Sequence, residues 1–333
     1  MLDFLKNNPL VEGARGARIR PRNLLLTLLL FYLVEMIARF FAALPSGIYA
    51  TFRMILLLGE DILAMADPAR SEELMQRMDE VLLAVTGEVG YILTSLFSTV
   101  IIILVVVIFC RFIEHRPISS MGLSLNRRSL VQYALGILVG LSLFSLAFLI
   151  LYATGAVTVT RAGFAPALIV AYLVAFLIQG AAEEVLLRGY FMVSATNQTP
   201  PLGAVLFSAL VFSALHISNN GISLLGTFNI FLFGVLLGFI VFRTRSLYLA
   251  MALHGIWNFA EGNLFGFPVS GILTQHSLLS SVITDGRTLT HGGEFGPEGG
   301  AAVTIVLLIA IAVFFLLPQK PNEEADTQEA TEA

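Results

Sequence analysis

The sequence predicts an all-α membrane protein with about eight transmembrane helices around a polar cavity inside the membrane. Of its 333 residues, 57% are hydrophobic and only 13% are charged, whereas about a quarter of the residues in soluble domains are charged. Mean hydropathy is +0.85, and several apolar runs exceed the ~18 residues that indicate a membrane span. This composition excludes a soluble enzyme and a disordered interaction protein.

The expected helices follow the apolar runs along the chain. These runs are 24–44, 91–113, 130–154, 163–187, 202–218, 224–242, 246–266 and 301–317. We expect the first run to be a retained helix, because no small-x-small cleavage site follows its leucine-rich stretch. One membrane domain, 23–318, would then follow a basic N-terminal segment, 1–22, and precede an acidic disordered tail, 319–333.

Two longer segments between the runs differ in character. Segment 46–90, which we place on the outer side, contains eight acidic and three basic residues. Within it, Asp67-Pro68 is typical of a helix start. An amphipathic helix on the outer membrane surface is expected from the helical spacing of Leu74, Met75, Met78 and Leu82. The glycine-rich segment 285–300 is expected to be a flexible outer loop.

The distribution of Lys and Arg predicts the orientation. With the N-terminus inside, 13 of the 19 Lys and Arg residues lie in the cytosol and five lie outside, and Arg39 falls within a span. This asymmetry favours two cytosolic termini, in the plasma membrane if the source is bacterial. We expect the cavity to open to the cytosol, because His254 lies near the cytosolic end of its helix. The net charge of −4 gives no indication of a nucleic-acid partner.

Three polar motifs lie within the expected spans, where each charge costs at least ~2.5 kcal/mol. They are Glu183-Glu184-Val185-Leu186-Leu187-Arg188, Phe212-Ser213-Ala214-Leu215-His216 and His254-Gly255-Ile256-Trp257-Asn258. Glu184 and Arg188 are four residues apart, which predicts a supporting ion pair. Glu183 points about 100° away, so its carboxylate remains free for chemistry. His254 and Asn258 share one helix face.

The motifs are able to meet if the helices pack as a bundle. A turn signal at 197–201 lies midway between Glu183 and His216, so a helical hairpin places both at a depth of ~24 Å. His254 lies only ~14 Å into its own helix. We therefore expect the hairpin to project, tilt or bend at Gly189.

Such a cluster offers water activation. A desolvated glutamate such as Glu183 would be the general base with one histidine beside it, while the second histidine and an Asn amide would donate hydrogen bonds to an oxyanion. Alternatively, Glu183, His216 and His254 would bind a divalent metal such as zinc and leave one position for water. The residues alone leave both alternatives open. The single cysteine, Cys110, excludes an intrachain disulfide and a cysteine-based zinc cluster.

The three motifs, in this order, resemble those of the CPBP family, which contains the CAAX proteases and bacteriocin-processing enzymes and is also called the Abi family. The resemblance covers about 163–266, and the stretch 116–123 resembles the usual lead-in of the family. It implies an intramembrane endopeptidase that cleaves membrane-associated or lipidated protein or peptide substrates, with the bilayer and these substrates as its partners.

Carried over by position, the resemblance makes Glu183 the water-activating glutamate and His216 its partner. His254 and Asn258 become the oxyanion-stabilising pair, while Glu184 and Arg188 support the site. Rival interpretations are a proton-coupled secondary transporter and a non-catalytic scaffold of the same fold. Against the transporter, the two halves of the chain contain no matching pair of broken helices.

Other polar and aromatic residues have simpler interpretations. Glu35 and Arg39 are expected to form a structural ion pair. Phe212 and Trp257 are expected to pack around the site. Glu261 is equally consistent with lining the site and with lying near the outer interface. The remaining histidines are expected to be solvated: His115, His276 and His291.

Overall fold

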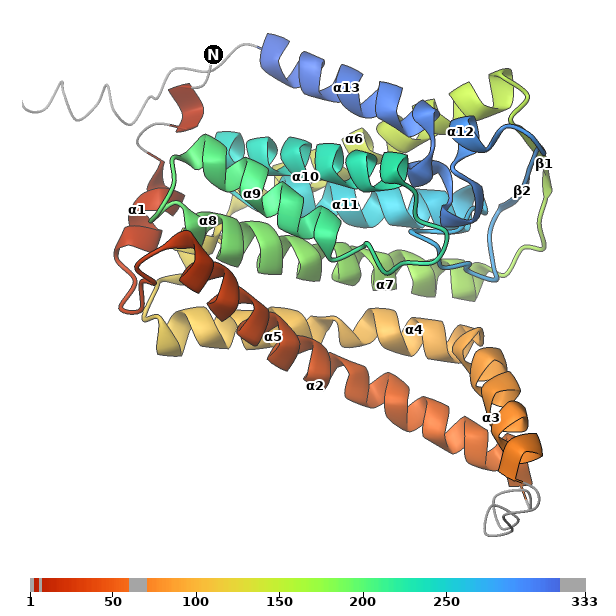
Figure 1. Ribbon diagram of the computed structural model, residues 1–333. Coiled ribbons are helices and arrows are strands. Elements are labelled where there is room, and N and C mark those ends of the chain that lie inside the picture. Colours follow the sequence, from red (N-terminus) through yellow and green to blue (C-terminus); the bar gives the residue numbers. More distant parts are fainter. Residues whose placement is uncertain (1–2, 6–7, 60–70, 318–333) are drawn as a thin grey trace, which may run out of the picture.

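The computed structural model describes residues 3–5, 8–59 and 71–317, most of them in helices that run side by side (Figure 1). The helices are α1 Pro9–Arg15, α2 Leu24–Leu58, α3 Ser71–Thr86, α4 Val89–Ser98, α5 Val100–Ile108, α6 Arg127–Ala153, α7 Pro166–Glu184, α8 Val193–Ala195, α9 Pro201–Ala214, α10 Leu224–Thr244, α11 Tyr248–Phe259, α12 Thr288–His291 and α13 Ala301–Leu316. The strands are β1 Val157–Arg161 and β2 Leu279–Ile283. Three π-helical segments extend helices: Phe109–Ile113, Val185–Met192 and Ala260–Leu264.

Five described helical segments are long and apolar enough to cross a membrane: Leu24–Leu58, Val89–Ile113, Arg127–Ala153, Pro166–Ala195 and Leu224–Thr244. They support the predicted membrane protein but not the predicted number of about eight spans. Helices α9 and α13 contain 14 and 16 residues, which gives ~21 and ~24 Å against a hydrocarbon core of ~30 Å. Helix α9 is shorter than the predicted run 202–218, since the chain forms a turn at 215–221.

Helix α2 is longer than the predicted first span. It continues through Pro45 to Leu58, a total of 35 residues, or ~52 Å. Helix α3 then packs on the end of α2 through the buried side chains Val81 and Val85, which meet Leu58.

The predicted amphipathic helix in this region therefore exists as α3. Met75 and Leu82 are exposed, whereas Met78 packs beside Val81 and Val85, which α3 buries against α2. The side chain of Leu74 and the Asp67-Pro68 helix start lie outside the described residues. The position of α3 on a membrane surface stays a prediction.

The end of the bundle that carries α12 differs from two predictions. It contains strands, although an all-α fold is predicted, and its glycine-rich loop is folded, although a flexible loop is predicted. Strands β1 and β2 pair antiparallel there, with Val157 opposite Ile283. The glycine-rich loop is folded, and residues 295–300 are all buried. Gly296 has a φ of 96°, and a Cβ there would lie 2.1 Å from the carbonyl oxygen of Pro268. The lack of a side chain at its glycines thus lets this loop fold tightly onto the bundle.

The same folded loop changes the environment of one predicted surface histidine. His291 is buried rather than solvated, and its two ring nitrogens contact the carbonyl of Thr284 and the backbone N–H of Gly293 at 3.1 Å each. His276 is half-buried, and His115 is exposed as expected.

Helices α7 and α11 cross in direct backbone contact. A Cβ on Gly180 would lie 2.5 Å from the backbone nitrogen of Gly255, and a Cβ on Gly255 would lie 2.7 Å from Cα of Leu177. Small residues allow membrane helices to approach this closely. The crossing lies one turn before Glu184 on α7 and next to His254 on α11, so it determines how closely the two polar motifs approach.

We predict that Gly255→Ala destabilises the protein by about 1–3 kcal/mol, the usual cost of inserting a methyl group into a filled contact. Thermal unfolding of the detergent-purified protein measures the effect. Gly47→Ala is the matched control, because a Cβ on this exposed helical glycine meets nothing within 4 Å. An unchanged melting temperature for Gly255→Ala would contradict the close crossing.

Candidate active site

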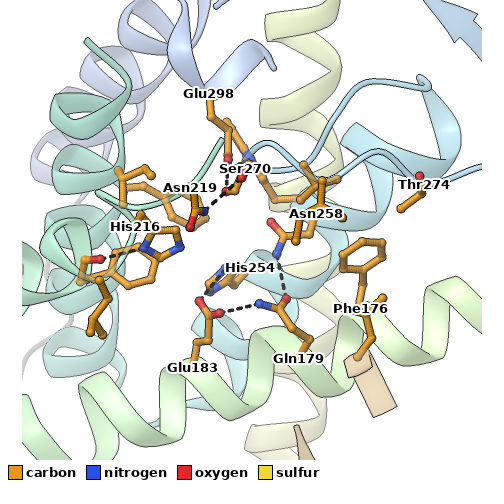
Figure 2. A pocket seen from close by; sticks show the side chains of 18 of the residues that line it. Phe176, Gln179, Glu183, His216, Asn219, His254, Asn258, Ser270, Thr274 and Glu298 are labelled. Atoms are coloured by element: carbon orange, nitrogen blue, oxygen red, sulfur yellow. Dashed lines mark hydrogen bonds and ion pairs between the residues drawn. The ribbon is translucent and has the colours of Figure 1, made fainter. Parts of the chain in front are cut away.

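A cavity of about 470 Å³ lies among the helices and brings the predicted catalytic residues together. Glu183 reaches it from the C-terminal end of α7, His216 from the turn after α9, and His254 and Asn258 from α11 (Figure 2). The predicted span 202–218 placed His216 within a helix, whereas it follows the helix end at Ala214. The segment around Gly189, Val185–Met192, is π-helical, and the choice among projection, tilt and a bend at Gly189 stays a prediction.

The two adjacent glutamates of α7 have different environments. The side chain of Glu183 is 21% exposed and lines the cavity, whereas that of Glu184 is 0% exposed. Glu183 Oε1 accepts a hydrogen bond from Gln179 Nε2 at 2.6 Å, and Glu183 Oε2 has no hydrogen-bond partner. Oε2 is buried and lies 3.7 Å from Nε2 of His254, so this oxygen sits beside the histidine at the edge of the cavity without a hydrogen-bond donor.

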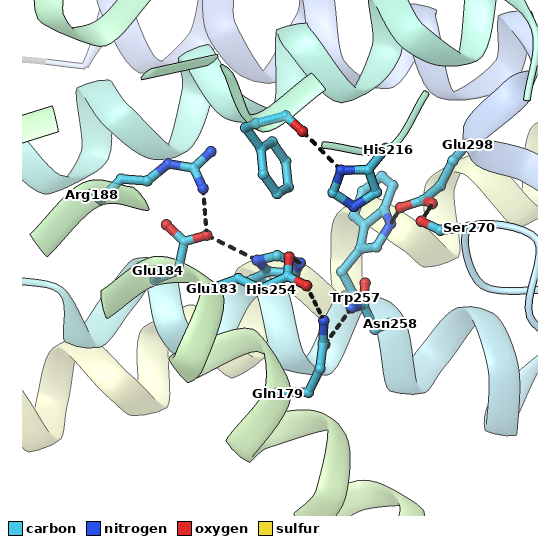
Figure 3. A network of polar contacts seen from close by, with 11 residues as sticks. Gln179, Glu183, Glu184, Arg188, His216, His254, Trp257, Asn258, Ser270 and Glu298 are labelled. Atoms are coloured by element: carbon cyan, nitrogen blue, oxygen red, sulfur yellow. Dashed lines mark hydrogen bonds and ion pairs between the residues drawn. The ribbon is translucent and has the colours of Figure 1, made fainter. Parts of the chain in front are cut away.

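Glu184 connects the first and third motifs (Figure 3). Its Oε1 accepts from Arg188 Nη1 and lies 2.9 Å from His254 Nδ1, and the Glu184–Arg188 distance is also 2.9 Å. An ionised carboxylate only accepts hydrogen bonds, so Nδ1 of His254 carries the proton. The Nε2 edge of His254 then faces Glu183, with 3.7 Å between Nε2 and Oε2.

Phe212 packs between the motifs, as the sequence predicts. The Arg188 guanidinium lies 4.4 Å from the centroid of the Phe212 ring, and this ring meets His216 and His254 edge-on at 4.8 and 5.9 Å. His216 Nδ1 lies 2.8 Å from the Phe212 carbonyl oxygen. Because a carbonyl only accepts, Nδ1 donates and Nε2 of His216 is left for the cavity.

Gln179 is a site residue that the motifs do not reveal. It donates to Glu183 through Nε2, so its Oε1 faces Asn258 and accepts from Asn258 Nδ2 at 2.9 Å (Figure 2). The chain Glu183–Gln179–Asn258 therefore orients both predicted catalytic side chains. The available signal was a polar residue in an apolar helix, four positions before Glu183.

The metal alternative requires Glu183, His216 and His254 to converge on one point. Among the described residues, no three His, Cys, Asp or Glu side chains form a group that could hold a metal ion. His254 keeps Nε2 for the site, since Nδ1 lies on Glu184, and the Phe212 ring lies against both histidines. The three candidate ligands therefore do not assemble into a metal centre in this arrangement.

The cavity lies toward the end of the bundle that is far from the termini. Its wall includes Ser270 and Thr274 from the segment between α11 and β2, and Glu298 from the segment between α12 and α13. Helix α1 and the described end of α13 lie at the opposite end (Figure 1). These lining residues do not support the predicted opening on the side of the termini, because that prediction used only the position of His254 near the cytosolic end of its helix.

The remaining predicted residues have the following positions. Glu35 and Arg39 form an ion pair, and Arg39 also lines the cavity. Trp257 is buried and donates from Nε1 to Glu298. Glu261 is fully buried but is not among the residues that line the cavity.

Comparison with known proteins gives one finding for this region. Residues 165–260 match the family model described as type II CAAX prenyl endopeptidase Rce1-like. The match covers less than a third of the chain and supports assignment of this segment to the CAAX protease family. All three polar motifs lie inside the match, whereas Ser270 and Glu298 lie beyond it.

The description of this family names an endopeptidase, so the match supports protease activity and peptide or protein substrates at the membrane. Together with the five apolar helices, it indicates an integral membrane protein. No curated protein and no solved structure matches the chain.

We predict that Arg188→Ala destabilises the protein by about 3–5 kcal/mol, because it leaves the buried Glu184 charge without its guanidinium. Arg188→Lys should recover only part of this loss, since an ammonium does not reproduce the planar guanidinium beside Phe212. Thermal unfolding in detergent measures both variants.

The control for Arg188→Ala is Arg77→Ala, which breaks an exposed pair with Glu80. Exposed pairs contribute little, so this variant should melt like the wild type. A wild-type melting temperature for Arg188→Ala would show that Glu184 does not depend on Arg188.

Proposed function

We propose that the protein is an intramembrane endopeptidase in which Glu183 activates the water that hydrolyses a peptide bond. The observation that carries this proposal is the contrast between the neighbouring glutamates. Glu184 is fully buried and bound to Arg188 and His254, whereas Glu183 reaches the cavity with Oε2 unpartnered. A general base must reach its substrate, and only Glu183 of this pair meets that condition.

In the proposed reaction, Glu183 Oε2 takes a proton from water as the water oxygen attacks the peptide carbonyl carbon. Gln179 holds the other carboxylate oxygen of Glu183 and so fixes the orientation of the carboxylate. When the tetrahedral intermediate collapses, the C–N bond breaks and the same proton passes from Glu183 to the leaving amine. No covalent enzyme intermediate is required.

The histidines and Asn258 are proposed to stabilise the oxyanion. The Nδ1 atoms of His216 and His254 are occupied by the Phe212 carbonyl and by Glu184. When protonated, either ring would donate into the cavity through Nε2. Asn258 Nδ2 uses one hydrogen on Gln179, and its second hydrogen would be available to the same oxyanion.

The proposed substrates are membrane-associated or lipidated peptides and proteins. We further propose that both termini lie in the cytosol, as the excess of basic residues predicts. With this orientation, the loops around α12 and the cavity that they line lie toward the outer side of the membrane. Substrates would then reach the cavity from the bilayer or from that side.

We predict that Glu183→Gln loses nearly all turnover, because an amide cannot accept the proton of the attacking water. Comparative proteomics of membrane fractions from cells with wild-type protein or Glu183→Gln measures the effect without a known substrate. Substrates should accumulate uncut in the variant, while the amount of folded protein stays constant.

Glu294→Gln is the matched control, since Glu294 is exposed and does not line the cavity. Its peptide profile should equal that of the wild type. Substantial cleavage by Glu183→Gln would contradict the general-base role. If the wild type cleaves no peptide and Glu183→Gln loses proton-coupled flux, the protein is a transporter instead.

We predict that removal of divalent metals leaves the proposed peptidase active, because its described side chains do not assemble a metal centre. The test is turnover of the purified protein after chelation and metal analysis. Loss of activity on chelation, with recovery on addition of zinc, would show that Glu183, His216 and His254 rearrange into ligands.

A further inference from the structure

We propose that Glu298 forms a subsite of the cavity that binds a lysine or arginine side chain of the substrate. This inference rests on the proposed peptidase function and adds a specificity-determining residue to it. Glu298 lines the same cavity as Glu183, His216, His254 and Asn258. It lies beyond residues 165–260, so the family match does not assign it.

Glu298 is held in a defined position. Glu298 is buried, with 8% of its surface exposed. Oε1 accepts from Trp257 Nε1 at 3.2 Å, and Oε2 accepts from Ser270 Oγ at 2.5 Å (Figure 3). Trp257 precedes Asn258 on α11, so the indole joins Glu298 directly to the helix that carries the proposed catalytic residues.

The carboxylate of Glu298 retains capacity for a cation. A carboxylate has about four acceptor positions, and the two neutral donors use two of them. Among the described residues, none of the ion pairs involves Glu298. Arg39, which lines the same cavity, is paired with Glu35.

A second acidic residue lies beside Glu298. Glu261 is fully buried and interacts with both the side chain and the backbone of Glu298. A buried carboxyl group without a cation takes up a proton and becomes neutral. Glu261 therefore adds no charge to the subsite, and the cation would pair with Glu298.

An independent feature of the same cavity also indicates a ligand. Thr274 lines the cavity and is 5% exposed, and its Oγ1 has no hydrogen-bond partner. Buried hydroxyls are normally hydrogen-bonded, so the cavity has polar capacity that the described chain does not use. Thr274 lies apart from Glu298 in Figure 2, so this hydroxyl would meet another part of the same substrate.

The shape of the cavity favours a long cationic side chain over a bare metal ion. The described residues form no three-ligand group for a metal. Apolar side chains between the two ends of the cavity, Ile230, Phe233 and Trp257, offer a surface for a methylene stem. Lys and Arg bury such stems along apolar surface while their charged ends reach a carboxylate.

The experiment digests a proteome-derived peptide library with purified protein and identifies the cleaved bonds. Glu183→Gln serves as the blank, and only cleavages absent from this blank are counted. We expect Lys or Arg to be enriched at one fixed position near the bond that the wild type cleaves. In Glu298→Gln, this enrichment should fall about tenfold or more, as expected for loss of a charge-assisted hydrogen bond.

Two matched variants separate charge from structure. Glu298→Asp retains the carboxylate and should retain the enrichment. Glu294→Gln removes an exposed charge from the same loop and should also retain it. Because enrichment is a ratio among peptides cleaved by active molecules, partial misfolding of a variant does not change it.

The outcomes distinguish this inference from the proposed function. Cleavage by the wild type without enrichment of Lys or Arg overturns the subsite, whether or not any variant folds. Enrichment that persists in Glu298→Gln also overturns it and leaves the peptidase function intact. If no cleavage depends on Glu183, the proposed function fails, and the subsite fails with it.

Discussion

The buried carboxylate of Glu184 is the interaction on which the arrangement of the site depends. It accepts from Arg188 one turn further along α7 and meets His254 on α11, so one charge joins two helices and fixes the histidine tautomer. The close crossing at Gly180 and Gly255 makes this contact possible. Without the guanidinium, Glu184 would be an uncompensated charge in an apolar bundle, which the fold tolerates poorly.

Helix geometry directs the consecutive glutamates Glu183 and Glu184 to different surroundings. Neighbouring residues on a helix point about 100° apart, so Glu184 faces the bundle while Glu183 faces the cavity. Glu183 is oriented by Gln179, which also holds Asn258. Each proposed catalytic side chain is thus positioned by a polar neighbour, and each positioning contact lies where apolar side chains exclude competing donors.

The cavity is lined both by the segment that matches the family model and by residues that follow this segment in the chain. The segment 165–260 supplies the motifs, whereas Ser270, Thr274 and Glu298 close one end. Glycines at positive φ allow the glycine-rich loop 285–300 to approach the bundle closely, as at Gly296. Chains that share the motifs but differ in this loop would therefore share their chemistry and differ in the substrates that they accept.

The sequence by itself determined whatever depends on composition or on spacing within one helix. The apolar runs indicated a helical membrane protein, and the i,i+4 spacing indicated the Glu184–Arg188 pair. Only the tertiary structure decided the Glu184–His254 contact, the role of Gln179, the early end of α9 and the folded loop that brings Glu298 to the cavity. The physical reason is the distance along the chain over which contacts form. Residue spacing determines which side chains are neighbours on one helix, whereas contacts between helices depend on where small side chains permit close packing.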